Sequence, residues 1–307
     1  MLRIAHLSDL HLPLAPGLPR QISLLANKRA LGFLSWHTKR KHIHKLEILQ
    51  ALLADVKTVA PDQIVITGDL TNISMAEEFT RALDWLRAAG GPESVMVVPG
   101  NHDAQVMMPW SQSLGLWEPY LAGDRKTSDT LFPVVRELGS IALIGLSSAV
   151  PSGLLRAQGL IGPAQLAALE DRLRGLGEKG AFRVVLLHHP PFPLPGQRRK
   201  ELVDWAGLQS TFQRAGVELV LHGHIHGFNL DRVETASGPA PVIAAPSASA
   251  SASHAGKGAG WNLCEIRRDG ATWRLDVSRR SLVPGDGLRF TETATFSFAL
   301  PAVSSAS

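Results

Sequence analysis

Residues 95–103 have the sequence VMVVPGNHD, in which a short apolar run is followed directly by polar residues. Consecutive apolar residues of this kind are typical of a buried β-strand, and the Pro99-Gly100 pair predicts that the strand ends there. Asn101, His102 and Asp103 follow at once, and their side chains can bind a metal ion or move a proton. Ligands of open α/β sheets bind beyond the carboxyl ends of the strands, so this stretch predicts an α/β fold with a site at that edge.

Four other apolar runs, at residues 2–7, 63–67, 183–187 and 217–221, end in the same manner. The polar residues that follow them are Asp9, His11, Asp69, His188, His189, His224 and His226. A single Asp or His after a strand is weak evidence, since such residues also form turns and caps, but the recurrence predicts a shared site. Carboxylate, amide and imidazole donors without a thiolate suit two divalent ions, with Mn, Fe or Zn expected. Such a pair would activate water against a phosphoryl group.

The segments between these runs complete the α/β pattern. Apolar residues recur with helical periodicity in residues 46–59, 79–86, 166–176 and 208–215, and a further strand is predicted at 141–146. Beyond residue 228 we expect a Ser/Ala-rich loop at 244–260, a hairpin that turns at Asp269-Gly270 and a strand near 288–300. No clear linker interrupts the chain, so residues 1–300 are expected to form one domain and residues 301–307 a frayed tail.

The overall composition is that of an ordinary globular protein. Of the 307 residues, 45% are hydrophobic and 19% are charged, which excludes a disordered chain. The single cysteine, Cys264, excludes an internal disulfide and fits a reducing compartment. No apolar run reaches the ~18 residues of a membrane span, and the first residues do not resemble a signal peptide, so a cytoplasmic location is expected.

The basic charge of the chain is concentrated in one segment. Residues 20–45 contain no acidic residue and seven basic ones, Arg20, Lys28, Arg29, Lys39, Arg40, Lys41 and Lys45. Without these seven the chain has 24 basic residues against 27 acidic ones, so the remainder is slightly negative. A local basic segment indicates a local anionic partner rather than a nucleic acid bound over a large surface.

As an ordered set, the polar strand ends resemble the motifs of the calcineurin-like metallophosphoesterase superfamily. The matching motifs extend from Asp9 to His226 and are Asp9-x-His11, Gly68-Asp69, Gly100-Asn101-His102-Asp103, His188 and Gly223-His224-x-His226. The resemblance implies a four-layer αββα sandwich, in which two mixed sheets pack back to back with helices outside. It also implies a metal-dependent hydrolase with a dinuclear site at the rim formed by the carboxyl ends of the strands.

The resemblance further implies a role for each motif residue. One metal ion would be bound by Asp9, His11 and His226. The other would be bound by Asn101, His188 and His224, and Asp69 would bridge the two. His102 would act as an acid or stabilise the transition state, oriented by Asp103. Because these residues fill both metal sites, His37, His42 and His44 are not expected to be ligands, and His6 is expected in the core.

The motifs do not specify the substrate, and residues 13–41 form extra chain at the rim. Their apolar and basic side chains would suit contact with the inner membrane surface through residues 20–45 and a lipid-linked nucleotide such as UDP-diacylglucosamine, which is the leading expectation. The alternative is a soluble 3′,5′-cyclic-nucleotide phosphodiesterase. A non-catalytic scaffold is disfavoured because no motif residue is replaced.

Two further points concern the surroundings of the site. Residues 13–41 could instead be a cap whose apolar face packs on the domain, and a nucleic-acid partner is disfavoured because only Phe33 and Trp36 could stack on bases. His189, Arg198 and Arg199 are expected to contact the substrate. The two arginines and Lys200 could form a clamp for a second phosphate, although a solvated charge run is at least as good an explanation.

Overall fold

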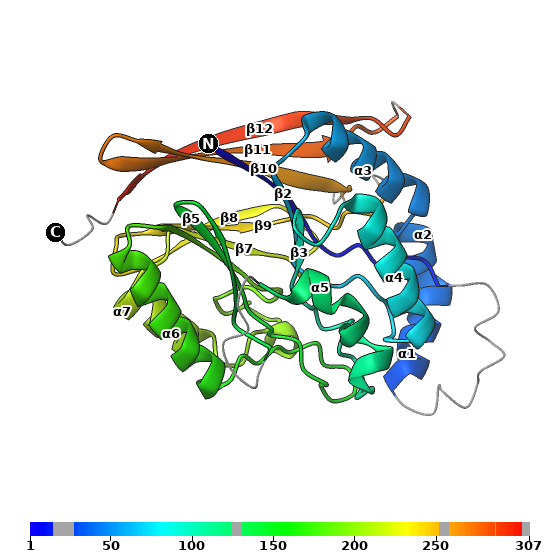
Figure 1. The fold of residues 1–307 in the computed structure, drawn as a ribbon. Coiled ribbons are helices and arrows are strands. Elements are labelled where there is room, and N and C mark those ends of the chain that lie inside the picture. Colours follow the sequence, from blue (N-terminus) through cyan, green and yellow to red (C-terminus); the bar gives the residue numbers. More distant parts are fainter. Residues whose placement is uncertain (15–27, 124–130, 252–257, 286, 303–307) are drawn as a thin grey trace.

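Two six-stranded mixed β-sheets form the centre of this protein in a computed structural model (Figure 1). The structure describes residues 1–14, 28–123, 131–251, 258–285 and 287–302. The first sheet contains β1 (Leu2–Leu7), β2 (Gln63–Ile66), β3 (Val95–Val97), β10 (Gly260–Asp269), β11 (Thr272–Leu282) and β12 (Phe290–Pro301). The second contains β4 (Val134–Leu138), β5 (Ile141–Gly145), β6 (Phe182–Leu186), β7 (Leu219–His222), β8 (Asn229–Val233) and β9 (Ala240–Ala244). The strand orders are β12-β11-β10-β1-β2-β3 and β4-β5-β6-β7-β9-β8.

Helices cover the outer face of each sheet. The main helices of the described chain are α1 (Lys28–Ser35), α2 (Lys41–Ile43), α3 (Leu46–Val59), α4 (Ala76–Ala89), α5 (Glu118–Leu121), α6 (Pro163–Glu178) and α7 (Trp205–Ala215). In Figure 1, α6 and α7 lie together on the side of the second sheet that faces away from the first. Apolar side chains of α3, α4 and α5 share a core with the first sheet, and those of α6 and α7 share one with the second. A third core lies between the sheets. The predicted four-layer sandwich is therefore confirmed.

The strands are continuous apolar runs because both of their faces are buried. Successive side chains of a strand point to opposite faces. In β1, Ile4 belongs to the core between the sheets, whereas Ala5 and Leu7 belong to the core under the helices. His6, expected in the core, is fully buried with its Nε2 3.0 Å from the Thr67 hydroxyl. Burial is the main reason that the pKa of His6 is lowered to about 3, so the ring is neutral.

The pairing of the strands brings the polar strand ends to one rim. β1 pairs in parallel with β2, and β2 with β3, so their carboxyl ends lie side by side. β6 and β7 are parallel neighbours in the second sheet. Parallel neighbours present their following loops at the same edge of a sheet, which is where the ligands of α/β proteins bind.

Three strands of the second sheet were not predicted from the sequence. β4 and β8 lie at the two edges of the sheet, and each carries charged residues that interrupt its apolar pattern. β9 has the sequence APVIA, which the surrounding Ala, Ser and Pro residues obscure. β9 ends at Ala244, the first residue of the Ser/Ala-rich stretch, and residues 245–250 beyond it lie outside the named strands but are buried. The backbone pairing of an edge strand depends on its neighbour rather than on its own pattern.

Some expectations are only partly covered by the described residues. Of the extra chain at 13–41, residues 15–27 lie outside the described ranges, including Arg20 of the basic segment, as do residues 303–307 of the expected tail. The single domain over residues 1–300 stays a prediction. In the described ranges, no helix has both the length and the apolar character needed to cross a membrane.

Candidate metal centre

The motif residues lie in tight turns that begin directly after the strands. Five of them have a left-handed backbone, with φ of +52° at Asp9, +42° at His11, +57° at Asp69, +70° at His224 and +52° at His226. This conformation costs a residue with a side chain about 1–2 kcal/mol. Such residues persist only where the surrounding structure holds them, and their concentration at one rim indicates a functional site.

Two glycines allow the turns to approach each other. Gly68, before Asp69, has φ of +94°, and a Cβ there would lie 2.6 Å from the backbone nitrogen of Gly100. A Cβ at Gly100 would in turn overlap the Asp69 carboxylate. Both positions therefore require glycine so that the loops after β2 and β3 can touch beneath the carboxylate.

A first group of donor atoms gathers around Asp9. His226 Nε2 lies 3.1 Å from Asp9 Oδ1 and 3.3 Å from His11 Nε2. His11 Nε2 lies 3.9 Å from Asp69 Oδ2. The donor atoms of these four residues all lie within 4.8 Å of one another, which is the spacing of a set that can surround one ion.

A second group of donor atoms gathers around His188. His188 Nε2 lies 3.2 Å from Asn101 Oδ1, 3.2 Å from His224 Nδ1 and 3.4 Å from Asp69 Oδ2. Asp69 Oδ2 is thus the oxygen that faces both His11 in the first group and His188 in the second. A carboxylate between two such groups has the position of a bridging ligand.

The charges and unpaired atoms of the rim fit divalent cations. Asp9 Oδ1 and His224 Nε2 are buried and have no hydrogen-bond partner. Burial, followed by the Arg40 charge, lowers the pKa of His11 well below its usual value, which leaves the imidazole in its ligand form. Burial would also lower the pKa of His188, but Asp69 outweighs it and raises that pKa to about 9. The carboxylates of Asp69 and Asp9 thus favour a positive charge on the buried His188 ring, and they would favour a bound cation for the same reason.

Comparison with known proteins identifies the family. A family model described as calcineurin-like phosphoesterase matches residues 2–228. The chain belongs to this family. Calcineurin-like phosphoesterases are hydrolases that act on phosphoester bonds, and the dimetal members hold two divalent ions.

Relatives and solved structures agree with this family. The chain is 30% identical over 190 residues to a probable cyclic nucleotide phosphodiesterase of Synechococcus sp. strain WH7803, covering 59% of this chain and 65% of that protein. It is 28% identical over 134 residues to a glycerophosphodiester phosphodiesterase of Enterobacter lignolyticus, covering 44% of each. The chain thus spans less than two thirds of the length of both. A dimetal phosphatase from Danio rerio shares the fold, with a TM-score of 0.55, 14% identity and coverage of 95% and 98% of the two chains.

The expected acid, His102, is oriented by a backbone carbonyl. Its Nδ1 lies 2.6 Å from the Asn72 oxygen, so Nδ1 carries the proton and donates it. Arg40 Nη2 then donates to the free Nε2 at 2.7 Å. Burial, followed by the Arg40 charge, lowers the pKa of His102 to about 4 and keeps the ring neutral.

Asp103 does not orient His102 as the resemblance implied. Its carboxylate accepts hydrogen bonds from the backbone N–H groups of Asp69, Thr71 and Gly100, at 2.8, 2.9 and 2.9 Å. These donors come from the turns that carry the metal-binding motifs. Asp103 therefore holds the loop after β2 against the loop after β3, and its contribution to the site is the position of Asp69.

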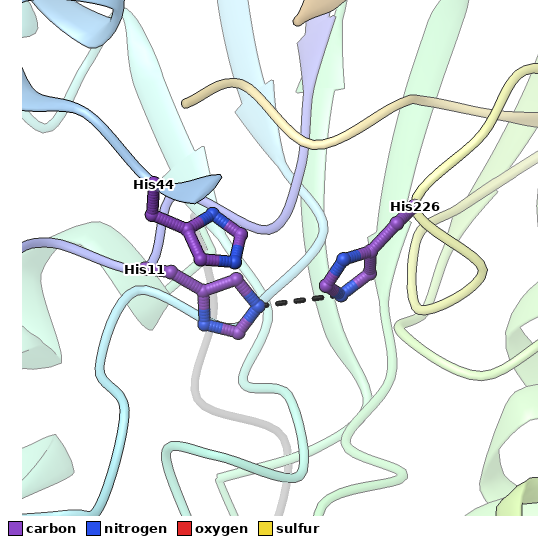
Figure 2. Close-up of side chains that lie close together, drawn as sticks. All are labelled: His11, His44 and His226. Carbon is purple, nitrogen blue, oxygen red and sulfur yellow. Dashed lines mark hydrogen bonds between the residues drawn. The ribbon is translucent and has the colours of Figure 1, made fainter. Parts of the chain in front are cut away.

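His44, which was not expected to be a ligand, lies beside the first donor group. Its ring centroid is 4.5 Å from that of His11 and 5.9 Å from that of His226, and Figure 2 shows the three rings gathered together. Donor atoms of the three lie within 4.8 Å of one another. His44 follows the end of α2, and its Nδ1 lies 2.9 Å from the Ser249 hydroxyl. In contrast His37 and His42 are exposed.

The Ser/Ala-rich stretch explains the position of His44. His44 pairs with Ala250 in an isolated antiparallel bridge, in which the Lys45 N–H donates to the Ser249 oxygen at 2.9 Å. The same stretch reaches the metal centre, because the Ser247 hydroxyl donates to the backbone oxygen of Asp9 at 2.7 Å. No periodicity in the sequence could reveal this contact, since the partners are about 200 residues apart.

Of the residues expected to contact the substrate, His189 is buried, whereas Arg198 and Arg199 are exposed. His189 is fully buried, with Nδ1 2.8 Å from the Ser148 hydroxyl and Nε2 3.1 Å from the Ala157 oxygen, so both nitrogens are occupied by the fold. Arg198 and Arg199 are exposed on a short 3₁₀ turn. The next residue, Lys200, lines a cavity beside the metal centre, and neither arginine belongs to that lining.

This cavity has a volume of about 610 Å³, and His224 and His226 of the metal centre are among the residues that line it. Its charged wall contains Lys39, Arg40 and Lys200, and its apolar wall includes Ile43, Leu194 and Phe228. None of the residues that line it is acidic. A cavity of this size fits a small molecule, and its charge favours an anion.

Proposed function

We propose that this chain hydrolyses a phosphodiester bond of a small anionic substrate at a dinuclear metal centre. The observation that carries the proposal is the position of Asp69 Oδ2, 3.9 Å from His11 and 3.4 Å from His188, between two groups of donors and beside a cationic cavity. The first group, Asp9, His11 and His226, would hold one ion. The second, Asn101, His188 and His224, would hold the other. Two bound ions would polarise a phosphoryl group and lower the pKa of a water molecule.

Hydrogen bonds within the protein fix the position of the Asp69 carboxylate and of the His102 ring at that centre. Asp103 fixes the backbone of Asp69, and the backbone N–H of His102 donates to Asp69 Oδ1 at 2.7 Å, which leaves Oδ2 for the two ions. The His102 ring, held by Asn72, stands between Asp69 and Arg40. Because Arg40 occupies its Nε2 in this structure, the role of His102 as an acid or as a group that stabilises the transition state stays a prediction.

Within this class we propose a 3′,5′-cyclic nucleotide as the substrate. Its single negative charge matches the cationic wall of the cavity, and its base matches the apolar wall around Phe228, where Asn229 offers an amide. The name of the Synechococcus relative supports the same substrate class. A phosphodiester with a cationic leaving group would place like charges beside Lys39 and Lys200, so it is expected to be a poorer substrate.

The lipid-linked nucleotide expected from the sequence stays a second candidate. Leu31 and Leu34 of α1 favour it, because they are 43% and 59% exposed and could meet an acyl chain or a membrane surface. Trp36 does not favour it, because only 5% of its surface is exposed and it is anchored in the protein.

A substrate panel tests this proposal. Protein purified with Mn is offered bis-p-nitrophenyl phosphate, cyclic AMP, UDP-diacylglucosamine and glycerophosphocholine, and kcat/KM is measured for each. We expect turnover of the chromogenic diester and the largest kcat/KM for cyclic AMP. A larger value for UDP-diacylglucosamine would replace the first candidate by the second. Absence of turnover for every diester, with two metal ions bound, would contradict the proposed function and would favour a scaffold.

A further inference from the structure

We propose that Arg40, presented by residues 28–45 at the rim, which we call the extra segment, is a substrate-binding residue that holds a non-bridging oxygen of the phosphoryl group next to the metal centre. The inference rests on the proposed function and adds a residue to it. Arg40 belongs to none of the five motifs, and its position depends on the packing of residues 28–45 against the rest of the protein.

The extra segment is packed firmly enough to position a side chain. Trp36, at the start of a π-helical turn (Trp36–Arg40), is buried, and Arg29 of α1 donates to the backbone oxygens of Ile73 at 3.1 Å and Ser74 at 2.5 Å. Ile73 and Ser74 belong to the same loop as Asp69. The segment therefore rests on the loop that carries the bridging carboxylate, which fixes the distance between that loop and Arg40.

The guanidinium of Arg40 faces the metal centre. Nη2 donates to His102 Nε2 at 2.7 Å, and the Arg40 charge is the largest cause after burial of the lowered pKa values of His11 and His102. Arg40 also lines the cavity together with His44 and His226. Its charge is thus directed at the space that a phosphoryl group bound by the centre would occupy.

Arg40 has no carboxylate partner of its own. Within the described ranges, no Asp or Glu forms an ion pair with it, whereas the fully buried Arg183 pairs with Glu218 at 2.6 Å. A partly buried guanidinium is costly without an anion, and its planar fork can keep one N–H on His102 while another binds a phosphoryl oxygen. The anion that partners Arg40 is therefore the phosphoryl group of the substrate.

Two substitutions separate substrate binding from a purely structural role. Arg40→Met removes the charge and the donors, and Arg40→Gln keeps an amide that can still donate to His102. Lys41→Met is the matched control, because Lys41 is the next residue and is exposed outside the cavity lining. Each Mn-loaded protein is tested for its metal content, its KM and kcat with bis-p-nitrophenyl phosphate, and its affinity for orthophosphate by calorimetry.

We expect both Arg40 variants to bind two metal ions and to lose affinity for orthophosphate and substrate by roughly 10- to 100-fold, the value of a hydrogen bond to a charged group. Lys41→Met should stay within about twofold of the wild type. Wild-type phosphate affinity in either Arg40 variant would overturn the inference, and wild-type affinity in Arg40→Gln alone would show that Arg40 only orients His102. The phosphate measurement needs no turnover, so it decides the role of Arg40 even if the proposed phosphodiesterase activity fails.

A measurement on the unaltered protein covers the case in which the variants do not fold. Phenylglyoxal modifies accessible arginines, and Arg40 is partly exposed. Orthophosphate should protect Arg40, but not the exposed Arg198, as determined by mass spectrometry of the digested protein. Equal modification of Arg40 with and without orthophosphate would contradict the inference.

Discussion

The rim of this protein contains two regions that present polar side chains in different ways. The motif residues follow strands directly, and left-handed turns at residues such as Asp9 and Asp69 aim their side chains within two or three residues of a strand end. Arg40 and His44 belong to the extra segment, where the side chains are placed by Trp36, by Arg29 and by the bridge to Ala250. The first region depends on local backbone geometry, and the second depends on packing between distant parts of the chain. Variants in the first region should therefore remove metal ions. Variants in the second should affect substrate binding and stability, and affect metal affinity only where a side chain such as His44 lies beside the metal-binding residues.

The largest effect is expected for Asp69→Asn. Both donor groups share this carboxylate, so its loss should lower bound metal from two ions to fewer than one and reduce kcat/KM by roughly a thousandfold or more. Metal content is measured by mass spectrometry and activity with bis-p-nitrophenyl phosphate. Asp62→Asn is the control, because Asp62 lies before β2 at the far end of that strand, where it accepts a hydrogen bond from the Arg3 backbone. Full metal content in the Asp69 variant would remove the bridging role.

His44→Ala sharpens the comparison, because His44 comes from the extra segment but lies beside a metal-binding group. We expect a roughly 10-fold loss of metal affinity at one site, typical of residues that support metal ligands, while the second ion stays bound. Titration of the apo protein with Mn measures this effect. His42→Ala, in the exposed part of the same segment, should match the wild type. Unchanged affinity for both ions in the His44 variant would show that His44 does not support metal binding.

The third prediction compares Trp36 with Leu34. Truncation of the buried Trp36 to Ala should destabilise the protein by about 3–5 kcal/mol, as for other large core residues, whereas Leu34→Ala should change the free energy of unfolding by less than about 0.5 kcal/mol. Urea denaturation measures both.

Vesicle binding by the same two variants tests the expected membrane contact. If the exposed face of α1 binds anionic vesicles, Leu34→Ala should weaken co-sedimentation. If neither the wild type nor the variant binds, the extra segment is a cap that packs on the domain.

The smallest effect is expected at Arg198 and Arg199, two of the three basic residues that the sequence suggested as a phosphate clamp. Arg198 and Arg199 are exposed and lie outside the cavity lining, so their substitution by Ala should change KM less than about twofold. Lys200→Ala removes a charge that does line the cavity, and it should raise KM for an anionic substrate several-fold at low salt. A large rise in KM on substitution of Arg198, with no change on substitution of Lys200, would show that Arg198 and not Lys200 contacts the substrate.

Most of the fold and the metal-binding motifs could be predicted from the sequence, because they depend on local patterns. Apolar runs such as 2–7 and 217–221 are strands because both of their faces are buried, and Gly68 and Gly100 mark turns in which a Cβ has no room. The edge strands β4 and β8 could not be predicted in this way, because a strand whose pattern is interrupted by charges is defined by its partner.

The sequence by itself determined the α/β class and the set of residues at the strand ends, since short-range order along the chain encodes them, and the four-layer sandwich followed from the family resemblance that those residues carry. Only the tertiary structure decided which other side chains join that rim. Arg40 and His44 lie in a basic stretch whose neighbours Lys39, Lys41 and His42 are exposed, and nothing in the local pattern separates them. They reach the site because Trp36 is buried and because residues 43–45 pair with the Ser/Ala-rich stretch. Such contacts arise from long-range packing, which the order of residues in one segment does not express.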